Sequence, residues 1–486
     1  MDAVYVYSRG SRVTLTLQPT CLVISGQHLG SARSTGVLSA CIQGDADSSG
    51  SDFVDYFRVV YAAVAGATLT LDVCELSPPE AKKRTARLGS VQFSVDAGDV
   101  DSVAAWTGRL LDRAYAQANT KLHKRLLVLV NPFGGQGRAR TLYETHARPV
   151  LRAARCEIVE MDTRYRNHAE EIMRTQFELG RYDAVLCCSG DGIPHEVFNG
   201  LGRRPDAALA LASTPVFQLP CGSGNAMCVN LVGSNDVALA ALTAVKGVVT
   251  PLDLCSVTQG ANRALSFLSQ TLGMIADCDL GTEHLRWMGE ARFTFGVVQR
   301  IITKATYPCT VSFKAVRTAR PDVLEAYRAG SAAEAELPPL PAAGALPDLA
   351  FGTVADPVPA DWTTLQLDTM AIFYVGNMAW MSSDANFFPA ALPSDALMDM
   401  VVVDGKVSRR AAVEIMLGVE DGKHFEHPDL TYYKLAAYRI TPRAPKGYIS
   451  IDGEAFDFSP FQVEVHRGIG RVLSRDGRYQ TTALDR

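Results

Sequence analysis

The sequence predicts an α/β protein in which a small β-rich domain precedes a lobe with a doubly wound parallel sheet and a C-terminal β-sandwich lobe. Three observations predict this order. Short apolar strands fill the chain up to about residue 120, strands alternate with helices from Lys121 to about residue 250, and strands dominate beyond it. Strand–helix alternation is typical of a parallel sheet, and runs of strands are typical of barrels and sandwiches. The expected domains are therefore 1–119, 120–250 and 251–486.

Length and composition favour a folded protein with more than one hydrophobic core. The chain has 486 residues, of which 47% are hydrophobic and 20% are charged, and this composition excludes a disordered chain. Its net charge of -5 argues against a general nucleic-acid binder, so we expect no nucleic-acid partner. The 11 cysteines are irregularly spaced and include no CxxC pair, which predicts free thiols rather than a disulfide framework or a structural zinc site.

The first part of the chain alternates in the manner of β-strands and ends in one amphipathic helix. The helix is expected over 99–116, with Val103, Trp106 and Leu110 on one face. Strands closed by a helix that carries a tryptophan look like a pleckstrin-homology-type barrel, a resemblance that implies contact with phosphoinositides or a partner. A β-rich scaffold without a ligand is equally open, because no compact basic cluster is present. The expected strands are 4–8, 13–17, 21–25, 35–42, 57–64, 68–76 and 90–98.

The second part alternates strands with helices. Helices are expected near 138–153, 167–180 and 195–202, and in such a βαβα order the ligand-binding turns follow the carboxyl ends of the parallel strands. The uncharged stretch from Ala207 to Asn235 contains prolines and glycines that would be costly in a bilayer helix, so we expect a buried strand, turn and helix there. The expected strands are 126–131, 156–163, 184–190 and 214–220.

The third part is mostly strands, which favours a β-sandwich. Two long helices are expected within it, at 281–305 and 408–420. An Ala/Pro-rich stretch at 329–361 is expected to be a surface insertion that is partly disordered. The expected strands are 253–257, 264–270, 307–316, 369–377, 397–405, 432–440, 447–453 and 461–468.

Three glycine-rich turns follow strands of the second part. They read NPFGGQGRAR (131–140), SGDGIPHEVFNGL (189–201) and PCGSGNA (220–226). Glycines let the backbone approach phosphate oxygens closely, and a helix N-terminus adds free N–H groups. Each turn alone is more simply a tight turn, and none matches a P-loop or GxGxxG. Three of them on one sheet edge predict a phosphate-binding site.

Asp191 lies between two glycines at a strand end, in the second turn. A carboxylate exposed there can accept the proton of a hydroxyl that attacks phosphorus. The alternative is an aspartate that only satisfies the N–H groups of its own turn.

Together the three turns resemble the catalytic domain shared by diacylglycerol, ceramide and sphingosine kinases. TRYRNHA (163–169) and the segments 273–292, 421–428, 432–439 and 451–454 are similar to the sphingosine (long-chain-base) kinases, specifically their fungal-type members. The resemblance covers about 120–320 and 368–470. It implies ATP- and Mg²⁺-dependent phosphorylation of the primary hydroxyl of sphingosine, dihydrosphingosine or phytosphingosine.

The resemblance also implies a role for individual residues. Asp191 would be the base, while Ser189, Gly190 and Gly192 would meet the lipid hydroxyl and the transferring phosphoryl group. Asp279 would pair with the substrate amine, and because diacylglycerol and ceramide lack that cation, Asp279 would select the substrate. The residues assigned to the nucleotide are Asn131, Pro132, Phe133, Thr163, Arg164, Tyr165, Arg166, Asn167, Glu196, Gly222, Ser223, Gly224, Arg286, Arg292, Asp452, Gly453 and Glu454.

Some positions depart from the family pattern or admit another reading. Arg138 stands where many relatives carry lysine, Tyr165 where they often carry arginine, and Cys221 is unusual in the third turn. Arg286 and Arg292 could instead be solvated helix charges. The apolar segments 378–381 and 386–392 would line a lipid cavity or simply pack in the core.

Other functions stay open: a ceramide or diacylglycerol kinase of the same fold, a soluble nucleotide kinase, or a non-catalytic lipid-binding regulatory protein. The N-terminus lacks the apolar run of a signal peptide and a myristoylation glycine, so we expect a cytoplasmic protein with peripheral membrane contact. A homodimer is also open.

Overall fold

The computed structural model describes residues 2–26, 51–78, 81, 83–116, 120–281, 291–333 and 336–485, without the side chains of 291–295. Two compact units share these residues. The first comprises Met1–Leu126, Thr141–Val159 and Asp236–Val248, and the second comprises the rest of the chain. Each unit combines segments that are separated along the chain, so the domain boundaries expected near 119 and 250 stay predictions.

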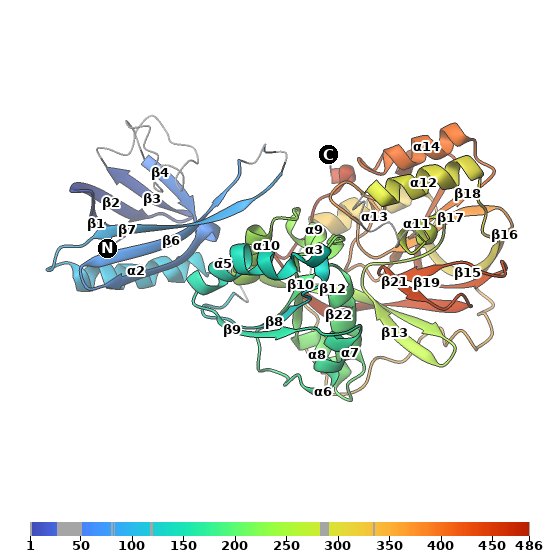
Figure 1. Cartoon of the computed structure of the whole chain (residues 1–486), viewed down its shortest axis with the longest axis horizontal. Helices are drawn as coiled ribbons and strands as arrows, with labels where there is room; N and C mark the ends of the chain where they lie inside the picture. The colour runs from blue at the N-terminus through green and yellow to red at the C-terminus, as the bar shows by residue number, and fades with distance from the viewer. Residues whose placement is uncertain are drawn as a thin grey trace. The chain divides into compact units, whose positions relative to one another are not determined.

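The first unit contains an antiparallel sheet of seven described strands in the order β4-β3-β2-β1-β7-β6-β5 (Figure 1). Helix α2 (Val100–Ala114) packs on β5, and its Val103, Trp106 and Leu110 are buried as predicted. This confirms the β-rich domain, while its likeness to a pleckstrin-homology domain stays a prediction. The expected strand at 35–42 lies outside the described residues. The strands are β1 (Ala3–Ser8), β2 (Ser11–Leu17), β3 (Cys21–Gly26), β4 (Ser51–Asp55), β5 (Val59–Ala65), β6 (Thr68–Leu76) and β7 (Ala86–Ser94).

The four strands expected in the α/β lobe are all present, within one or two residues of their predicted bounds. They are β8 (Arg125–Val130), β9 (Glu157–Asp162), β10 (Ala184–Ser189) and β11 (Pro215–Pro220), and they lie in the order β11-β10-β8-β9. β10 and β11 run parallel, so their carboxyl ends lie side by side. The helices between them are α3 (Gly134–Gly137), α4 (Ala139–Leu142), a π-helical turn (Tyr143–Ala147), α5 (Arg148–Ala153), α6 (His168–Thr175), α7 (Gly192–Gly202) and α8 (Ala207–Ser213), and β11 is followed by α9 (Ala226–Val232) and α10 (Val237–Lys246).

The last long strand joins the two lobes that the sequence predicts separately. β22 (Phe461–Ser474) pairs in parallel with β11 through Arg471 and Val472, and antiparallel with β19 (Leu430–Pro442). The described strands from β8 onward therefore form one 15-stranded sheet. Its other members are β12 (Val248–Gln259), β13 (Asn262–Ser266), β14 (Ser269–Gly273), β15 (Cys309–Arg317), β16 (Thr363–Leu367), β17 (Met370–Gly376), β18 (Met398–Asp404), β20 (Ile449–Ile451) and β21 (Glu454–Phe456).

Strand β17 separates two apolar clusters. Phe373 and Val375 point into one cluster, together with Tyr438 of β19 and Val463 of β22. Ile372 and Tyr374 alternate with them and point to the other face, as the period of two in a strand requires. Figure 1 shows α11 (Met274–Asp279), α12 (Ala291–Thr303) and α14 (Arg409–Gly418) grouped beside these strands. The second cluster, which contains Ile372, Tyr374, Phe387 and Phe388, lies beneath these helices.

Two expectations for the third part concern segments that the structure describes only in part. The helix expected at 281–305 is present as α12 from Ala291 to Thr303, and 282–290 lie outside the described residues. The stretch expected to be partly disordered begins inside a further helix, α13 (Arg320–Ala332). The part of it that the structure describes beyond α13 is anchored, because Glu464 accepts hydrogen bonds of 3.0 Å from the backbone N–H groups of Ala350 and Phe351.

In the described part of the chain, no single helix is long and apolar enough to cross a membrane. There, only the bent pair α9 and α10, taken together, has the length and composition for it.

Candidate functional site

The three glycine turns touch one another through their backbones. A side chain on Gly222 of the third turn would overlap the backbone of Gly190 in the second, and a Cβ on Gly190 would lie only 2.8 Å from the carbonyl oxygen of Gly224. A side chain on Gly135 of the first turn, where φ is 55°, would overlap the carbonyl oxygen of Cys221. Glycine is therefore required at these positions because two segments of the backbone approach each other closely. The predicted convergence of the three turns is confirmed.

Backbone hydrogen bonds fix this convergence at the strand ends. The Asn131 N–H donates to the carbonyl of Cys188 at 3.1 Å, and the Cys221 N–H donates to the carbonyl of Ser189 at 3.2 Å. The Ser189 hydroxyl is buried and donates to the carbonyl of Gly190, whereas Ser223 is exposed.

Asp191 is bound by groups from outside its own turn. Its Oδ2 accepts from the N–H of Ala226 at 2.9 Å, and its Oδ1 accepts from the N–H of Met227 at 3.0 Å and from the side-chain amide of Gln218 at 3.2 Å. In the described structure it makes no side-chain bond to the N-terminus of α7, so the alternative of a simple turn former is wrong. The carboxylate instead links the second turn to β11 and α9.

The surroundings of Asp191 make it a stronger base than an ordinary aspartate. Desolvation raises the pKa of Asp191 to about 6, although the hydrogen bonds from Met227, Ala226 and Gln218 lower it and the nearby Asp452 charge raises it. A carboxylate with this pKa is mostly ionised at neutral pH and still able to take up a proton.

Glu196 holds the 163–169 segment against α7. Its two carboxylate oxygens accept from the N–H groups of Asn167 and Ala169, each at 2.9 Å, and desolvation raises the pKa of this carboxyl while those bonds lower it. Asn167 has a left-handed backbone, with φ of 64°, and begins α6. The buried Thr163 N–H donates to the carbonyl of Val130 at 2.8 Å, which ties the segment to β8.

Two aromatic side chains project from these nucleotide-assigned loops. Phe133 is 77% exposed and Tyr165 is 55% exposed. The Tyr165 ring packs against His168 at a tilt of 37°, with ring centroids 4.4 Å apart, and its hydroxyl donates to Glu171 at 2.7 Å. Tyr165 is thus held in place with much of its ring open to solvent.

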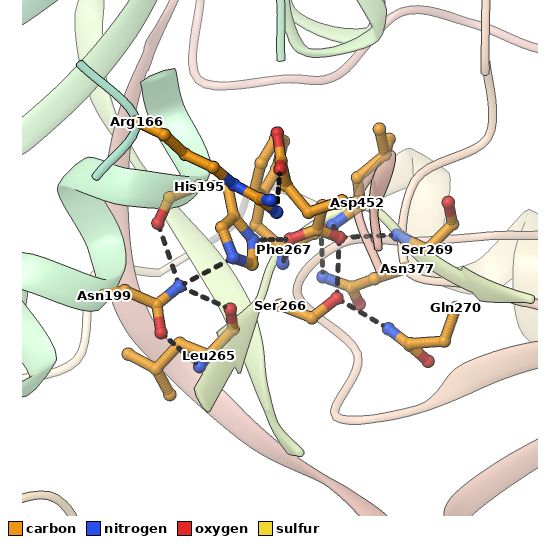
Figure 2. Close-up of polar contacts among 12 residues, drawn as sticks. Arg166, His195, Asn199, Leu265, Ser266, Phe267, Ser269, Gln270, Asn377 and Asp452 are labelled. Atoms are coloured by element: carbon orange, nitrogen blue, oxygen red, sulfur yellow. Dashed lines mark hydrogen bonds and ion pairs between the residues drawn. The ribbon is translucent and has the colours of Figure 1, made fainter. Parts of the chain in front are cut away.

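In the Asp452-Gly453-Glu454 turn, which the resemblance assigns to the nucleotide, the two carboxylates have different surroundings. The Asp452 carboxylate is buried and accepts five hydrogen bonds, as Figure 2 shows. Glu454 accepts from Arg166 at 2.8 Å, and a Cβ on Gly192 would lie 2.9 Å from its Oε1. Glu454 therefore lies beside the start of α7, while Asp452 holds the turn. The donors to Asp452 are His195 Nδ1 (2.8 Å), Ser266 Oγ (2.7 Å), and the N–H groups of Phe267 (3.0 Å), Leu268 (3.0 Å) and Ser269 (2.9 Å).

Sequence reasoning missed His195 and Asn199. They lie four residues apart on one face of α7, and Asn199 exchanges two hydrogen bonds of 2.9 Å with the backbone of Leu265. Its amide nitrogen donates at 2.9 Å to the carbonyls of His195 and Leu265 and lies 3.3 Å from Nε2 of His195, while Nδ1 of His195 donates to Asp452 at 2.8 Å. The signal in the sequence was the i, i+4 spacing of two polar residues in the helix that begins after Asp191.

Asp279 is the last residue of α11 and lies where a polar edge meets an apolar cluster. Its Oδ2 accepts from the Ser450 hydroxyl at 2.9 Å. The preceding residues Met274, Ile275 and Cys278 are buried in the apolar cluster beneath α11, α12 and α14. Arg286 lies outside the described residues, and the side chain of Arg292 is likewise not described, so their assignments stay predictions.

No group of three or more metal-ligating side chains occurs among the described residues. Mg²⁺ typically needs only one or two carboxylates when substrate phosphates and water complete its shell, so the donor set fits a phosphate-borne ion.

Three family models match the chain. The diacylglycerol kinase catalytic domain matches residues 125–257, and the YegS C-terminal NAD kinase beta sandwich-like domain matches 343–474. A domain of unknown function matches 6–116.

Curated proteins similar to this chain are kinases of sphingoid lipids. Sphingoid long chain base kinase 5 of Saccharomyces cerevisiae is 36% identical over 77% of this chain, which spans 62% of that relative's length. Sphingoid long chain base kinase 4 of Schizosaccharomyces pombe is 34% identical over 76% of this chain and 79% of its own. Human sphingosine kinase 1 is 33% identical over 70% of this chain and 88% of its own length. A solved diacylglycerol kinase structure from Bacillus anthracis covers 72% of this chain and 97% of its own, with 16% identity and a TM-score of 0.45.

Proposed function

The chain belongs to the sphingosine kinase family, and from this premise we propose that it transfers the γ-phosphoryl group of ATP to the primary hydroxyl of a sphingoid long-chain base. The observation that carries the proposal is the convergence of three glycine turns on Asp191, with Asp279 at the edge of an apolar cluster. Sphingosine, dihydrosphingosine and phytosphingosine all carry the amine and the hydroxyl that this arrangement needs.

Asp191 acts as the base in this proposal. The lipid hydroxyl approaches the γ-phosphorus in line with the leaving oxygen, and its proton moves to the Asp191 carboxylate. The N–H groups of Ala226 and Met227 hold that carboxylate, so its oxygens are oriented before substrate arrives. Positioning and charge neutralisation supply most of the rate enhancement.

The nucleotide lies along the first and third turns and the 163–169 segment. Glu454, the half-buried carboxylate that pairs with Arg166 beside Gly192, would hold a Mg²⁺ ion, which would neutralise charge on the triphosphate. The exposed rings of Phe133 and Tyr165 offer faces on which a purine can stack.

Asp279 reads the substrate amine. An ammonium close to the reacting hydroxyl can pair with this carboxylate, and the long alkyl chain of the base can then enter the apolar cluster below α11. Ceramide and diacylglycerol present no cation, so they could not form this ion pair with Asp279.

The test compares wild type with Asp279→Asn on a panel of sphingosine, dihydrosphingosine, ceramide and diacylglycerol, with Mg²⁺–ATP throughout. We expect the wild type to phosphorylate the two amines and Asp279→Asn to lose about tenfold or more in kcat/KM for them. Ceramide or diacylglycerol as the preferred substrate would refute the assignment. Unchanged amine preference in Asp279→Asn would refute the role of Asp279, and binding of lipid without any turnover would favour the non-catalytic alternative.

We also propose a cytoplasmic protein that contacts membranes peripherally through α12 and α14. Ile302 on α12 and Leu417 on α14 are 60% and 72% exposed. Arg409 donates to the carbonyl of Ile302 at 3.1 Å and Lys304 follows closely in the chain, whereas Leu417 lies near Glu420 and Asp421. An exposed apolar side chain beside cations, as at Ile302, fits an anionic bilayer. Whether the protein forms a homodimer is a separate question, which sedimentation of the purified chain tests.

A further inference from the structure

The turn between β20 and β21 connects the two carboxylates on which the proposed reaction depends. Asp452 and Gly453 form this two-residue turn, with φ of 52° and 84°, as an Asp-Gly hairpin turn requires. On one side, Ser450 of β20 donates to Asp279. On the other, Glu454 of β21 lies against Gly192, directly after Asp191. The position of the turn therefore affects the spacing between Asp191 and Asp279.

Four of the five donors to Asp452 come from one place. Ser266 and the N–H groups of 267–269 all belong to the connection between β13 and β14. Among the described residues, the fifth donor, His195, is the one that comes from α7, the helix that begins directly after Asp191. His195 thus links α7, the helix that begins after Asp191, directly to the β20–β21 turn, which lies beside Asp279.

The His195 side chain is itself fixed by packing and by Asn199. It is buried, its ring lies edge-on to Phe456 of β21 with centroids 6.5 Å apart, and Nε2 faces the amide of Asn199. Asn199 also bonds the backbone of Leu265, which keeps α7 against β13 without the help of His195. Loss of the imidazole would therefore release the turn from α7 while both elements keep their other anchors.

We propose that His195 is a positioning residue that fixes the β20–β21 turn against α7 and thereby sets the spacing between the base Asp191 and the amine reader Asp279. It contacts neither substrate nor nucleotide. This inference rests on the proposed function, because the spacing matters only if one lipid must meet both carboxylates. In an active site, a small misplacement of this kind costs about 100-fold in rate.

Three substitutions separate positioning from packing. His195→Ala removes the ring and the donor. His195→Asn places an amide N–H close to where Nδ1 donates, and His195→Gln fills similar space but carries its amide near the position of Nε2. We expect His195→Ala and His195→Gln to lose about 10- to 100-fold in kcat/KM for sphingosine, and His195→Asn to stay within about threefold of wild type.

A second readout distinguishes positioning from general damage. The Kd for ATP, measured calorimetrically without lipid and without Mg²⁺, should stay within about threefold in all three variants, while the lipid KM rises and kcat falls. If His195→Ala fails to fold, the Asn and Gln variants carry the same comparison. If His195→Asn and His195→Gln lost activity equally, or if His195→Ala or His195→Gln turned over normally, this inference would be overturned while the proposed function would stand. No turnover of sphingosine by the wild type would overturn the proposed function first, and this inference with it.

Discussion

At the scale of single residues, Asp191 combines the position of a base with the hydrogen bonds of a structural residue. Three donors hold its carboxylate and yet its pKa is raised, because desolvation outweighs their effect. The sequence placed this aspartate between two glycines at a strand end, which predicted its role. The three donors come from Gln218, Ala226 and Met227, which are distant in sequence, so its environment could not be predicted.

The raised pKa of Asp191 predicts the pH dependence of the reaction. A base must be ionised to accept a proton, so kcat/KM should rise with pH up to about 6 and level off above it, falling about tenfold per unit on the acid side. Steady-state rates with sphingosine between pH 5 and 8 measure this. Since the Gln218 amide lowers the pKa of Asp191, Gln218→Met should move the acid limb to higher pH. A flat profile down to pH 5 would contradict the account.

The exposed rings of Phe133 and Tyr165 predict a stacking contribution to nucleotide binding. Alanine at either position should weaken ATP binding by about 1–3 kcal/mol, the range for base–aromatic stacking. Calorimetric titration with ATP in the absence of lipid measures the Kd. Tyr5→Ala is the matched control, because Tyr5 is 49% exposed in the first unit and should leave the Kd unchanged. An unaltered Kd in both Phe133→Ala and Tyr165→Ala would contradict the assignment.

At the scale of elements, the sequence predicts the strands well because apolar, β-branched runs bounded by glycines are strong local signals. It missed α13, although Pro321 and Asp322 in the first turn are both favourable at a helix start; only its last residues, 329–332, belong to the Ala/Pro-rich stretch. It also could not show that β22 pairs with β11, because that pairing joins residues more than 250 positions apart. His195 and Asp452 are separated similarly, so their contact was hidden as well.

The close approach of the glycine turns predicts that even a methyl group will disrupt them. Gly222→Ala must push the third turn away from Gly190, so ATP binding should weaken about tenfold or more. Gly108→Ala provides the control, because a Cβ there meets nothing within 4 Å on an exposed face of α2 and should be neutral or slightly stabilising. ATP titration and thermal unfolding of both variants measure these effects. Normal ATP affinity in Gly222→Ala would show that the turns do not form one site.

At the scale of the whole molecule, a soluble nucleotide and a membrane lipid must meet at one site. The proposed membrane surface on α12 and α14 predicts that Ile302→Ser and Leu417→Ser together will weaken binding to vesicles of phosphatidylcholine and phosphatidylserine by about tenfold or more, since each side chain contributes apolar area. Vesicle sedimentation measures the bound fraction. Leu340→Ser is the control, because Leu340 is also exposed but lies in the Ala/Pro-rich stretch. Equal binding by all variants would place the contact elsewhere.

The most direct test of the whole account is phosphoryl transfer by Asp191→Asn. Purified wild type and variant are given γ-labelled Mg²⁺–ATP and sphingosine, and labelled lipid is measured over time alongside the Kd for ATP and thermal unfolding. We predict that the wild type forms sphingosine 1-phosphate, and that the variant binds ATP almost as tightly yet forms product about 100- to 10,000-fold more slowly. Product formation by Asp191→Asn at close to the wild-type rate would contradict the central claim.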